Sequence, residues 1–282
     1  MFLTAMTANP LIAGLAQKVV GIEVSWGVWA LAASVPGVIS LILVPLFVYY
    51  IYPPEQKHAP EARKLAAEEL VKMGPITRPE TILLGIFTLS LVGWCTGTIT
   101  KLDATVVALS AVALMLITKV VEWEDVLNEK GAWDTLVWVG VLVGMAGLLT
   151  SKGFVPWFAK AVSSSMGGLD WPLALALITI IYLYSQYGFA SLTAHAAGMF
   201  TAFLAVAVAM GAPPYLSILI LGFAGCLCSA LTHYSVAFGP IFYSAGFVPL
   251  TTWCRIGFVT SVLLIIIWGA AGSFWWKLIG LW

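Results

Sequence analysis

The stretch that decides the fold runs from residue 171 to residue 254 and contains no Asp, Glu, Lys or Arg. Within it, residues 185–195 read SQYGFASLTAH, and residues 229–240 read SALTHYSVAFGP. Glycine, proline, histidine and small hydroxyl residues thus interrupt long apolar runs at two places. In a bilayer, such interruptions free backbone groups that must be satisfied by protein, water or a ligand. The pattern therefore predicts interrupted membrane helices that build a ligand site.

The composition of the whole chain also indicates a membrane protein. The 282 residues are 61% hydrophobic and 9% charged, with a mean hydropathy of +1.00, whereas soluble domains carry about 25% charged residues. Several segments approach the roughly 20 apolar residues that a helix needs to cross a bilayer. We expect an all-α polytopic membrane protein. Because the net charge is zero, nothing favours nucleic acid as a partner.

The chain divides into three parts. Residues 1–52 hold a helix that Pro10 is expected to break, and then one long span whose aromatic end, 49–52, is typical of a membrane interface. Residues 53–80 form a linker with an amphipathic helix, whose apolar face is predicted at Leu65, Leu70 and Val71. The basic residues of this linker place it in the cytoplasm by the positive-inside rule.

Residues 81–282 form the third part and contain the charge-free region. The elements expected there are spans at 81–99, 104–121 and 135–151, an interfacial segment at 152–168, a hairpin at about 171–211, a broken helix at about 215–252 and a last span at 256–281. The count of crossings does not separate a re-entrant hairpin from two full spans.

An internal repeat is indicated by two similar segments, residues 3–14 and residues 231–246, each followed by a Trp and one long span. The expected topology gives these two copies opposite orientations in the membrane. Opposite orientation of equivalent elements is the pattern of an inverted-repeat transporter, which binds substrate near the midplane at discontinuous helices. Residues 1–52 are then the end of a first repeat, and residues 81–282 are a second repeat.

Three motifs carry a resemblance to a known family: FLTAMTANPL at 2–11, FASLTAH at 189–195, and LTHY at 231–234 followed by Gly239-Pro240. With the WWK ending at 275–277, the chain resembles the C-terminal portion of the divalent anion/sodium symporter family. The similarity is to its branch of 2-oxoglutarate/malate translocators and citrate/succinate antiporters. The resemblance implies two inverted repeats, each with a re-entrant hairpin and a helix broken at the midplane. The tip of the first hairpin is expected upstream of Met1.

The resemblance also implies where substrate binds. The second hairpin tip is Ser191-Leu192-Thr193, and the broken helices are Thr4–Pro10 and Thr232–Pro240. Leu192 replaces an Asn of the sodium-coupled members, so no cofactor is expected and sodium coupling is left open but disfavoured. The candidate substrate-binding residues are Ser191, Leu192, Thr193, Thr232, Asn9, Thr4, His195 and His233. The candidate backbone-shaping residues are Pro10, Gly188, Gly239 and Pro240.

A carboxylate would be bound here without a cationic side chain. Helix N-termini and hairpin tips supply free N–H groups and a partial positive charge. The hydroxyls of Ser191, Thr193 and Thr232 add donors, although Ser and Thr in membrane helices also bond their own backbone. For His195 and His233, a contact with substrate and a hydrogen bond between packed helices are equally favoured roles.

The function expected is secondary exchange of di- or tricarboxylates, such as 2-oxoglutarate, malate, succinate or citrate. The setting would be a bacterial inner membrane or a plastid inner envelope. The alternative is a transport-incompetent C-terminal fragment from a truncated gene. Expected partners are small carboxylates and the lipid bilayer, with a homodimer as a candidate assembly.

An intramembrane enzyme is the third reading, and it would use His195, His233 and Cys228. It is disfavoured because no intramembrane Asp or Glu accompanies these residues, so neither enzymatic activity nor a metal is expected. Cys226 and Cys228 are interpreted as helix-packing residues, since no further ligand cluster accompanies them.

Overall fold

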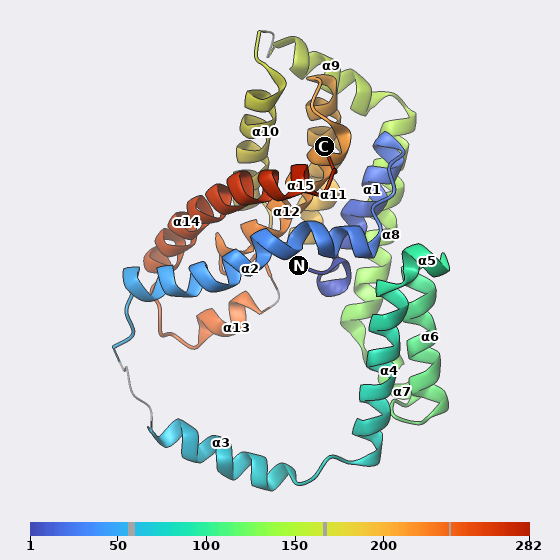
Figure 1. Cartoon of the computed structure of the whole chain (residues 1–282), viewed down its shortest axis with the longest axis vertical. Helices are drawn as coiled ribbons and strands as arrows, with labels where there is room; N and C mark the ends of the chain where they lie inside the picture. Colours follow the sequence, from blue (N-terminus) through green and yellow to red (C-terminus); the bar gives the residue numbers. More distant parts are fainter. Residues whose placement is uncertain (56–59, 166–167, 237) are drawn as a thin grey trace. The chain divides into compact units, whose positions relative to one another are not determined.

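The computed structural model describes residues 1–55, 60–165, 168–236 and 238–282, which are helical and contain no β-strand (Figure 1). Three helices in these residues are long and apolar enough to cross a membrane: Trp26–Ile51, Leu192–Ala209 and Leu250–Leu278. A fourth span results if the bent pair Glu61–Met73 and Arg78–Cys95 is counted as one. The expectation of an all-α, multi-pass integral membrane protein is confirmed.

Two compact units can be described, each by itself: residues 1–48 with 134–282, and residues 49–133. The first unit contains most of the helices. In chain order they are η1 (Leu3–Ala5), α1 (Ala8–Val20), α2 (Trp26–Ile51), α8 (Lys130–Ser151), α9 (Phe154–Ser165), α10 (Trp171–Ser185), η2 (Gln186–Gly188), α11 (Leu192–Ala209), α12 (Pro214–Leu227), η3 (Cys228–Ala230), α13 (Gly239–Ser244), α14 (Leu250–Ile267), η4 (Trp268–Gly272) and α15 (Ser273–Leu278). The final residues of α2 and the first of α8 belong to the second unit.

Helix α11 is the centre of the first unit, because α1, α9, α10 and α12 all pack against it. Its buried residues lie on several sides of the helix, from Leu192 and His195 to Val206 and Ala207. A helix that is apolar all round is normally surrounded by other helices. Helices α10 and α11 also contact each other and share α12 as a neighbour. They form a helical hairpin with its tip at residues 186–191.

The segment η4–α15 lies beside α2 (Figure 1), and three of its indole N–H groups donate hydrogen bonds to α2. Pro36 in α2 has no N–H to donate to the carbonyl of Ala32, four residues earlier. The indole of Trp276 donates to this carbonyl at 2.8 Å, and Trp276 is fully buried. A carbonyl freed by proline inside a membrane helix is thus satisfied by a neighbouring helix.

The second unit contains α3 (Pro60–Met73), α4 (Arg78–Cys95), α5 (Gly97–Thr100), α6 (Ala104–Ile117) and α7 (Trp123–Asn128). Helices α4 and α6 pack against each other, and the indole of Trp94 donates to the carbonyl of Ala104 at 3.0 Å. Helix α4 begins at Arg78 because Thr77 and Glu80 form a capping box, in which each side chain accepts the other's backbone N–H.

Two local expectations were wrong. The break expected at Pro10 falls earlier, because Met6 is extended (φ −145°, ψ 144°) and α1 begins at Ala8. Pro10 lies in the first turn of α1, where its missing N–H leaves no hydrogen bond unmade. In α3, Leu65, Leu70 and Val71 do not share one face. Successive helical residues turn by about 100°, which places Leu70 about 140° from Leu65 and about 100° from Val71.

Candidate functional site

The hairpin tip begins where α10 ends and carries the first group of candidate residues. Ser191 is extended and caps α11, because its hydroxyl oxygen accepts a hydrogen bond from the N–H of Thr193 at 3.2 Å. Its O–H remains available as a donor, since a hydroxyl both donates and accepts. The side chain of Thr193 is half-buried beside it. The tip therefore places two hydroxyls at the N-terminus of an 18-residue helix.

The second break separates α12 from α13 and contains Thr232, which is 2% exposed. Ser235 stabilises the break, because its hydroxyl lies 3.1 Å from the carbonyl of Ser229 and 3.2 Å from that of Thr232. Among the described residues, five buried side-chain atoms have no hydrogen-bond partner, and two of them, Thr232 Oγ1 and His233 Nδ1, lie in this break. The other three are Tyr182 Oη, His195 Nδ1 and Thr260 Oγ1. A buried polar group left unpaired costs about 1–3 kcal/mol. A ligand that bonds to Thr232 Oγ1 would remove that cost.

The hairpin tip and the second break contact each other directly. The backbone N–H of Leu192 donates to the carbonyl of Ser235 at 3.1 Å. The phenol of Tyr234 donates to the carbonyl of Tyr187 at 3.0 Å. Because the N–H of Leu192 is already bonded and its side chain is buried, Leu192 holds the tip against the break.

The first break reaches the same region through Asn9, which is buried. The amide nitrogen of Asn9 donates to the carbonyl of Phe2 at 3.0 Å, and its oxygen accepts from the thiol of Cys226 at 2.7 Å. Cys226 lies at the end of α12, directly before the second break. The exposed Thr4 accepts a hydrogen bond from the indole of Trp26 at 3.2 Å. Asn9 therefore links the start of α1 to the end of α12.

The two candidate histidines occupy different surroundings. His195 is fully buried, with Nε2 2.8 Å from the hydroxyl of Ser185 and its ring 4.5 Å from that of Tyr182. Its position joins the two arms of the hairpin, although its Nδ1 has no partner among the described residues. His233 lies in the second break, where its half-buried ring is 4.5 Å from the ring of Tyr243.

The candidate backbone-shaping residues differ in how much the structure requires them. A Cβ at Gly239 would overlap the carbonyl oxygen of His233, so the chain passes too closely there for any side chain. Pro240 lies in the first turn of α13, where proline suits a helix start. Gly188 has open space around the position of a Cβ and no positive φ. The local geometry therefore gives no steric reason for glycine at 188.

Sequence reasoning missed several residues that shape this region. Cys226 was assigned to packing, but its thiol donates to Asn9. Ser235 and Ser185 bond within the break and the hairpin. A Cβ at Gly257 in α14 would overlap the carbonyl oxygen of Ala230 in η3. The only sequence signals were a Cys close to a break and a Gly inside an apolar span, where small residues often permit close helix contact.

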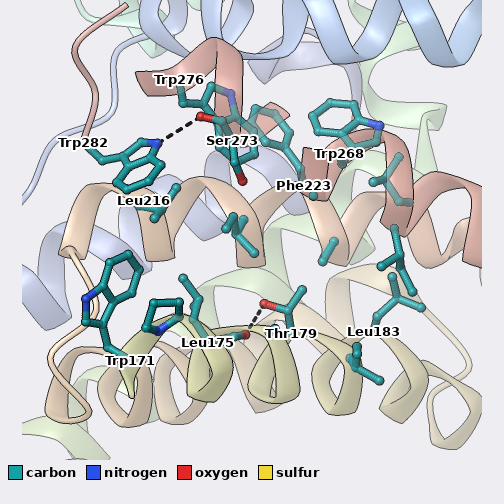
Figure 2. A pocket seen from close by; sticks show the side chains of 18 residues that line it. Trp171, Leu175, Thr179, Leu183, Leu216, Phe223, Trp268, Ser273, Trp276 and Trp282 are labelled. Carbon is teal, nitrogen blue, oxygen red and sulfur yellow. Dashed lines mark hydrogen bonds between the residues drawn. The ribbon is translucent and has the colours of Figure 1, made fainter. Parts of the chain in front are cut away.

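A cavity of about 320 Å³ lies elsewhere in the first unit, between α10, α12 and the segment η4–α15 (Figure 2). Figure 2 shows the rings of Trp171 and Trp282 at one end of it. Its lining is mainly apolar, and the hydroxyl of Thr179 is already bonded to the carbonyl of Leu175 at 2.7 Å. None of the candidate tip or break residues lines this cavity, which suits hydrocarbon better than a carboxylate.

The candidate site therefore consists of three backbone interruptions held together by hydrogen bonds. They are η1 with the start of α1, the hairpin tip, and the break after α12. The described residues contain no group of three or more His, Cys, Asp or Glu side chains that could hold a metal ion. The N–H groups of Leu192 and Thr193 are already bonded, so the chemistry offered is hydrogen bonding by hydroxyls beside the partial positive charge of a helix N-terminus, which suits an anion.

Comparison with known proteins gives consistent matches over the full sequence. Residues 1–282 match the family described as the sodium:sulfate symporter transmembrane region. Dicarboxylate transporter 1 of spinach (Spinacia oleracea) chloroplasts is 46% identical over 284 residues, covering 100% of this chain and 50% of the relative. YflS of Bacillus subtilis, provisionally named a malate transporter, is 47% identical, and the match covers 100% of this chain and 59% of the relative. The inner membrane protein YbhI of Escherichia coli is 35% identical, with 99% and 58% covered. The chain thus spans 50% to 59% of the length of these relatives.

Proposed function

The chain belongs to the sodium:sulfate symporter family, and we propose that it binds small di- or tricarboxylates and takes part in their exchange across a membrane. The observation that carries the proposal is the meeting of the hairpin tip with the second break. There the buried hydroxyl of Thr232 has no partner among the described residues. The proposal gives the chain a transport role and no catalytic one.

The chemistry of this region supports an anionic substrate that is held without a permanent cation. No Lys or Arg occurs from residue 171 to residue 254. The N-terminus of α11 contributes a partial positive charge of about half an elementary charge, and Ser191, Thr193 and Thr232 contribute hydroxyl donors. Binding through neutral donors is weaker than binding through a buried ion pair. Weak binding suits a carrier, which must release its substrate on each side.

The substrates we propose are 2-oxoglutarate, malate, succinate and citrate. Their support comes from the match of motifs to the family and from the names of the spinach and Bacillus subtilis relatives. We further propose exchange driven by internal carboxylate and not by sodium. Leu192 at the hairpin tip has no side-chain amide or hydroxyl with which to bind a cation. A homodimer is the assembly we propose to test.

Counterflow into proteoliposomes tests the proposal. Vesicles are loaded with unlabelled malate, and the uptake of labelled 2-oxoglutarate, malate, succinate and citrate is measured, with an amine and a sugar as controls. Two proteins are compared. One is the 282-residue chain itself. The other is a fused protein, in which this chain replaces the matched region of the spinach relative. Crosslinking in the same vesicles reports the oligomeric state.

Carboxylate uptake by either protein, abolished by unlabelled competitor and absent for the controls, would support the proposal. Uptake of the amine or the sugar without uptake of any carboxylate would refute it. Ser191→Ala and Thr193→Ala should each lower apparent affinity by roughly tenfold to a hundredfold, the equivalent of a lost hydrogen bond to a charged group.

The alternative is that the chain inserts into the membrane but does not transport when it is alone. The observation that favours it is the length of the chain relative to the proteins it matches. The same experiment separates the two readings, because the alternative requires uptake by the fused protein only. Exchange by the chain alone would exclude it.

A further inference from the structure

In helix α3, all side chains from Glu61 to Met73 are exposed. Ala62, Ala66, Leu70 and Met73 follow one another at intervals of four, four and three residues, which places them on one side of a helix. Leu70 is 68% exposed and Met73 is 75% exposed. We call these four residues the apolar stripe. An exposed apolar stripe marks a surface that can pack against another apolar surface.

The opposite side of α3 carries four charged residues, bordered by the exposed Leu65 and Val71. Glu61, Lys64, Glu68 and Lys72 are spaced so that they share this side, and Lys72 also forms an ion pair with Glu69 at 2.6 Å. From Glu61 to Met73 the helix has three acidic and three basic residues, so its net charge is zero. The charge of α3 therefore gives it no preference for a partner of either sign.

The connection between α3 and α4 determines how α3 lies. Gly74 ends α3 in a left-handed conformation (φ +72°), which glycine adopts without strain. The capping box of Thr77 and Glu80 then starts α4. The two helices meet at 104°. When α4 stands as a span, α3 runs close to the membrane plane.

The same connection also limits how far α3 can be from the membrane. Residues 74–77 separate the two helices, and four residues reach at most about 14 Å when fully extended. The headgroup layer on each side of the hydrocarbon core is about 5–8 Å thick. The apolar run at 81–99 predicts that α4 spans the membrane by itself, and its 18 residues are about the length of a membrane-spanning helix. With α4 as a span, the end of α3 is held within or beside that layer.

We propose that α3 is a membrane-surface helix whose apolar stripe inserts into the headgroup–acyl boundary of a phospholipid bilayer. Leu70 and Met73 are the side chains that enter deepest, and the charged side faces the headgroups and water. Burial of apolar area drives the interaction, as in other interfacial helices. Because α3 has no net charge, the interaction does not depend on anionic lipid or on low ionic strength. This interface is independent of the transport proposed above.

A photocrosslinking experiment tests this inference on the full chain in vesicles. Benzoylphenylalanine is introduced in place of Leu70, on the apolar stripe, or of Glu68, on the charged side. The same replacement at Leu89 in α4, a residue that is exposed within the expected span, reports insertion. The vesicles are pure phosphatidylcholine or contain phosphatidylglycerol, at low and high salt. Mass spectrometry identifies lipid or protein adducts.

We expect a lipid adduct from position 70 at least about fivefold above that from position 68, comparable to position 89, and unchanged by anionic lipid or salt. Equal lipid adducts at 68 and 70 would overturn the proposal. So would an adduct of position 70 with a second protein chain, or no lipid adduct there while position 89 reacts. Failure of position 89 to react would remove α4 from the bilayer and overturn it as well.

Discussion

Thr232 is the residue on which the candidate site depends most. Its hydroxyl is buried in the second break and has no partner among the described residues. A structural threonine in a membrane helix normally donates to a carbonyl of the preceding turn, as Thr179 does. Thr260 also has a buried hydroxyl without a partner among the described residues, but it lies inside α14. Thr232 is the ligand candidate because it combines the missing partner with a position in the second break.

Replacing Thr232 with Val tests this difference, because valine keeps the shape and removes the hydroxyl. If the hydroxyl binds substrate, apparent affinity should fall roughly tenfold to a hundredfold while thermal stability stays the same or rises. Affinity is measured by counterflow and stability by thermal unfolding in detergent. Thr179→Val is the matched control and should leave affinity unchanged. Unchanged affinity in Thr232→Val would remove Thr232 from the site.

Cys226 is a second residue with a specific role, since its thiol donates to the buried amide of Asn9. Cys226→Ser keeps a donor at this position and should transport like the original chain. Cys226→Val loses the donor and should lower apparent affinity several-fold, because an unpaired buried amide oxygen costs about 1–3 kcal/mol. Cys254→Val in α14 serves as a control. Equal behaviour of the Ser and Val variants in the counterflow assay would contradict a positioning role for Cys226.

At the scale of elements, a tryptophan side chain from the C-terminal segment supplies the hydrogen-bond donor that one backbone carbonyl of α2 lacks. Pro36 frees the carbonyl of Ala32, and the indole of Trp276 binds it. Trp275 and Trp268 add bonds to Leu31 and Ser40 on the same helix. A proline inside a membrane span is tolerated because a neighbouring helix supplies the missing donor.

A double-mutant cycle measures how much the hydrogen bond from Trp276 to the carbonyl of Ala32 contributes to stability. Trp276→Phe should destabilise the chain by about 0.5–1.5 kcal/mol beyond the loss of packing, because the carbonyl of Ala32 then has no donor. In a Pro36→Ala background, α2 restores its own hydrogen bond, so the same substitution should cost less. Unfolding in detergent reports both costs. Identical costs in the two backgrounds would show that the indole N–H contributes nothing to stability.

The approach of α14 to η3 is also set by one residue, Gly257. A Cβ there meets the carbonyl oxygen of Ala230, just before the second break. Gly257→Ala should therefore destabilise the chain by about 1–3 kcal/mol, as overpacking does. Gly269→Ala, in η4 of the same C-terminal segment, meets nothing within 4 Å and should be close to neutral. The contact would be less tight than described if thermal unfolding ranked the two variants equally.

At the scale of the whole molecule, the arrangement of the three interruptions bears on which ion accompanies the substrate. Leu192 lies at the tip with a buried apolar side chain, and its N–H is bonded to Ser235. No side-chain oxygen is available from this position to coordinate a cation. This is the ground on which we propose exchange of one anion for another.

Uptake should accordingly be the same with sodium, potassium or choline outside the vesicles, provided that a carboxylate is present inside. Initial rates in the fused protein measure this, with ionic strength held constant. The matched variant is Leu192→Asn, which restores an amide oxygen and should introduce some dependence on sodium. Uptake that stops without a sodium gradient, even when internal carboxylate is present, would contradict exchange as the mechanism.

Much of the architecture could be predicted from the amino-acid sequence alone. The free energy of placing a residue in the bilayer depends mainly on its own side chain, so composition and length predict a polytopic helical protein and the approximate positions of its long helices. Glycine, proline and polar residues inside apolar runs likewise predict where the backbone is interrupted, as between Thr232 and Pro240. The direction of side chains on α3 was misjudged, although the helical period alone would have been enough to place them.

What only the tertiary structure decided is which interruptions meet and which polar groups are left free. Asn9 and Cys226 are 217 residues apart in the chain and 2.7 Å apart in space. Trp276 and Ala32 are 244 residues apart and joined at 2.8 Å, and Leu192 bonds to Ser235 across a shorter stretch of the chain at 3.1 Å. Whether a buried donor is satisfied depends on groups from distant helices, and no local pattern encodes that. The transfer of each residue into the bilayer depends on that residue alone, so it determines where the helices form. Packing depends on pairs of residues, so it determines that the hydroxyl of Thr232 is unpaired and that the N–H of Leu192 is bonded.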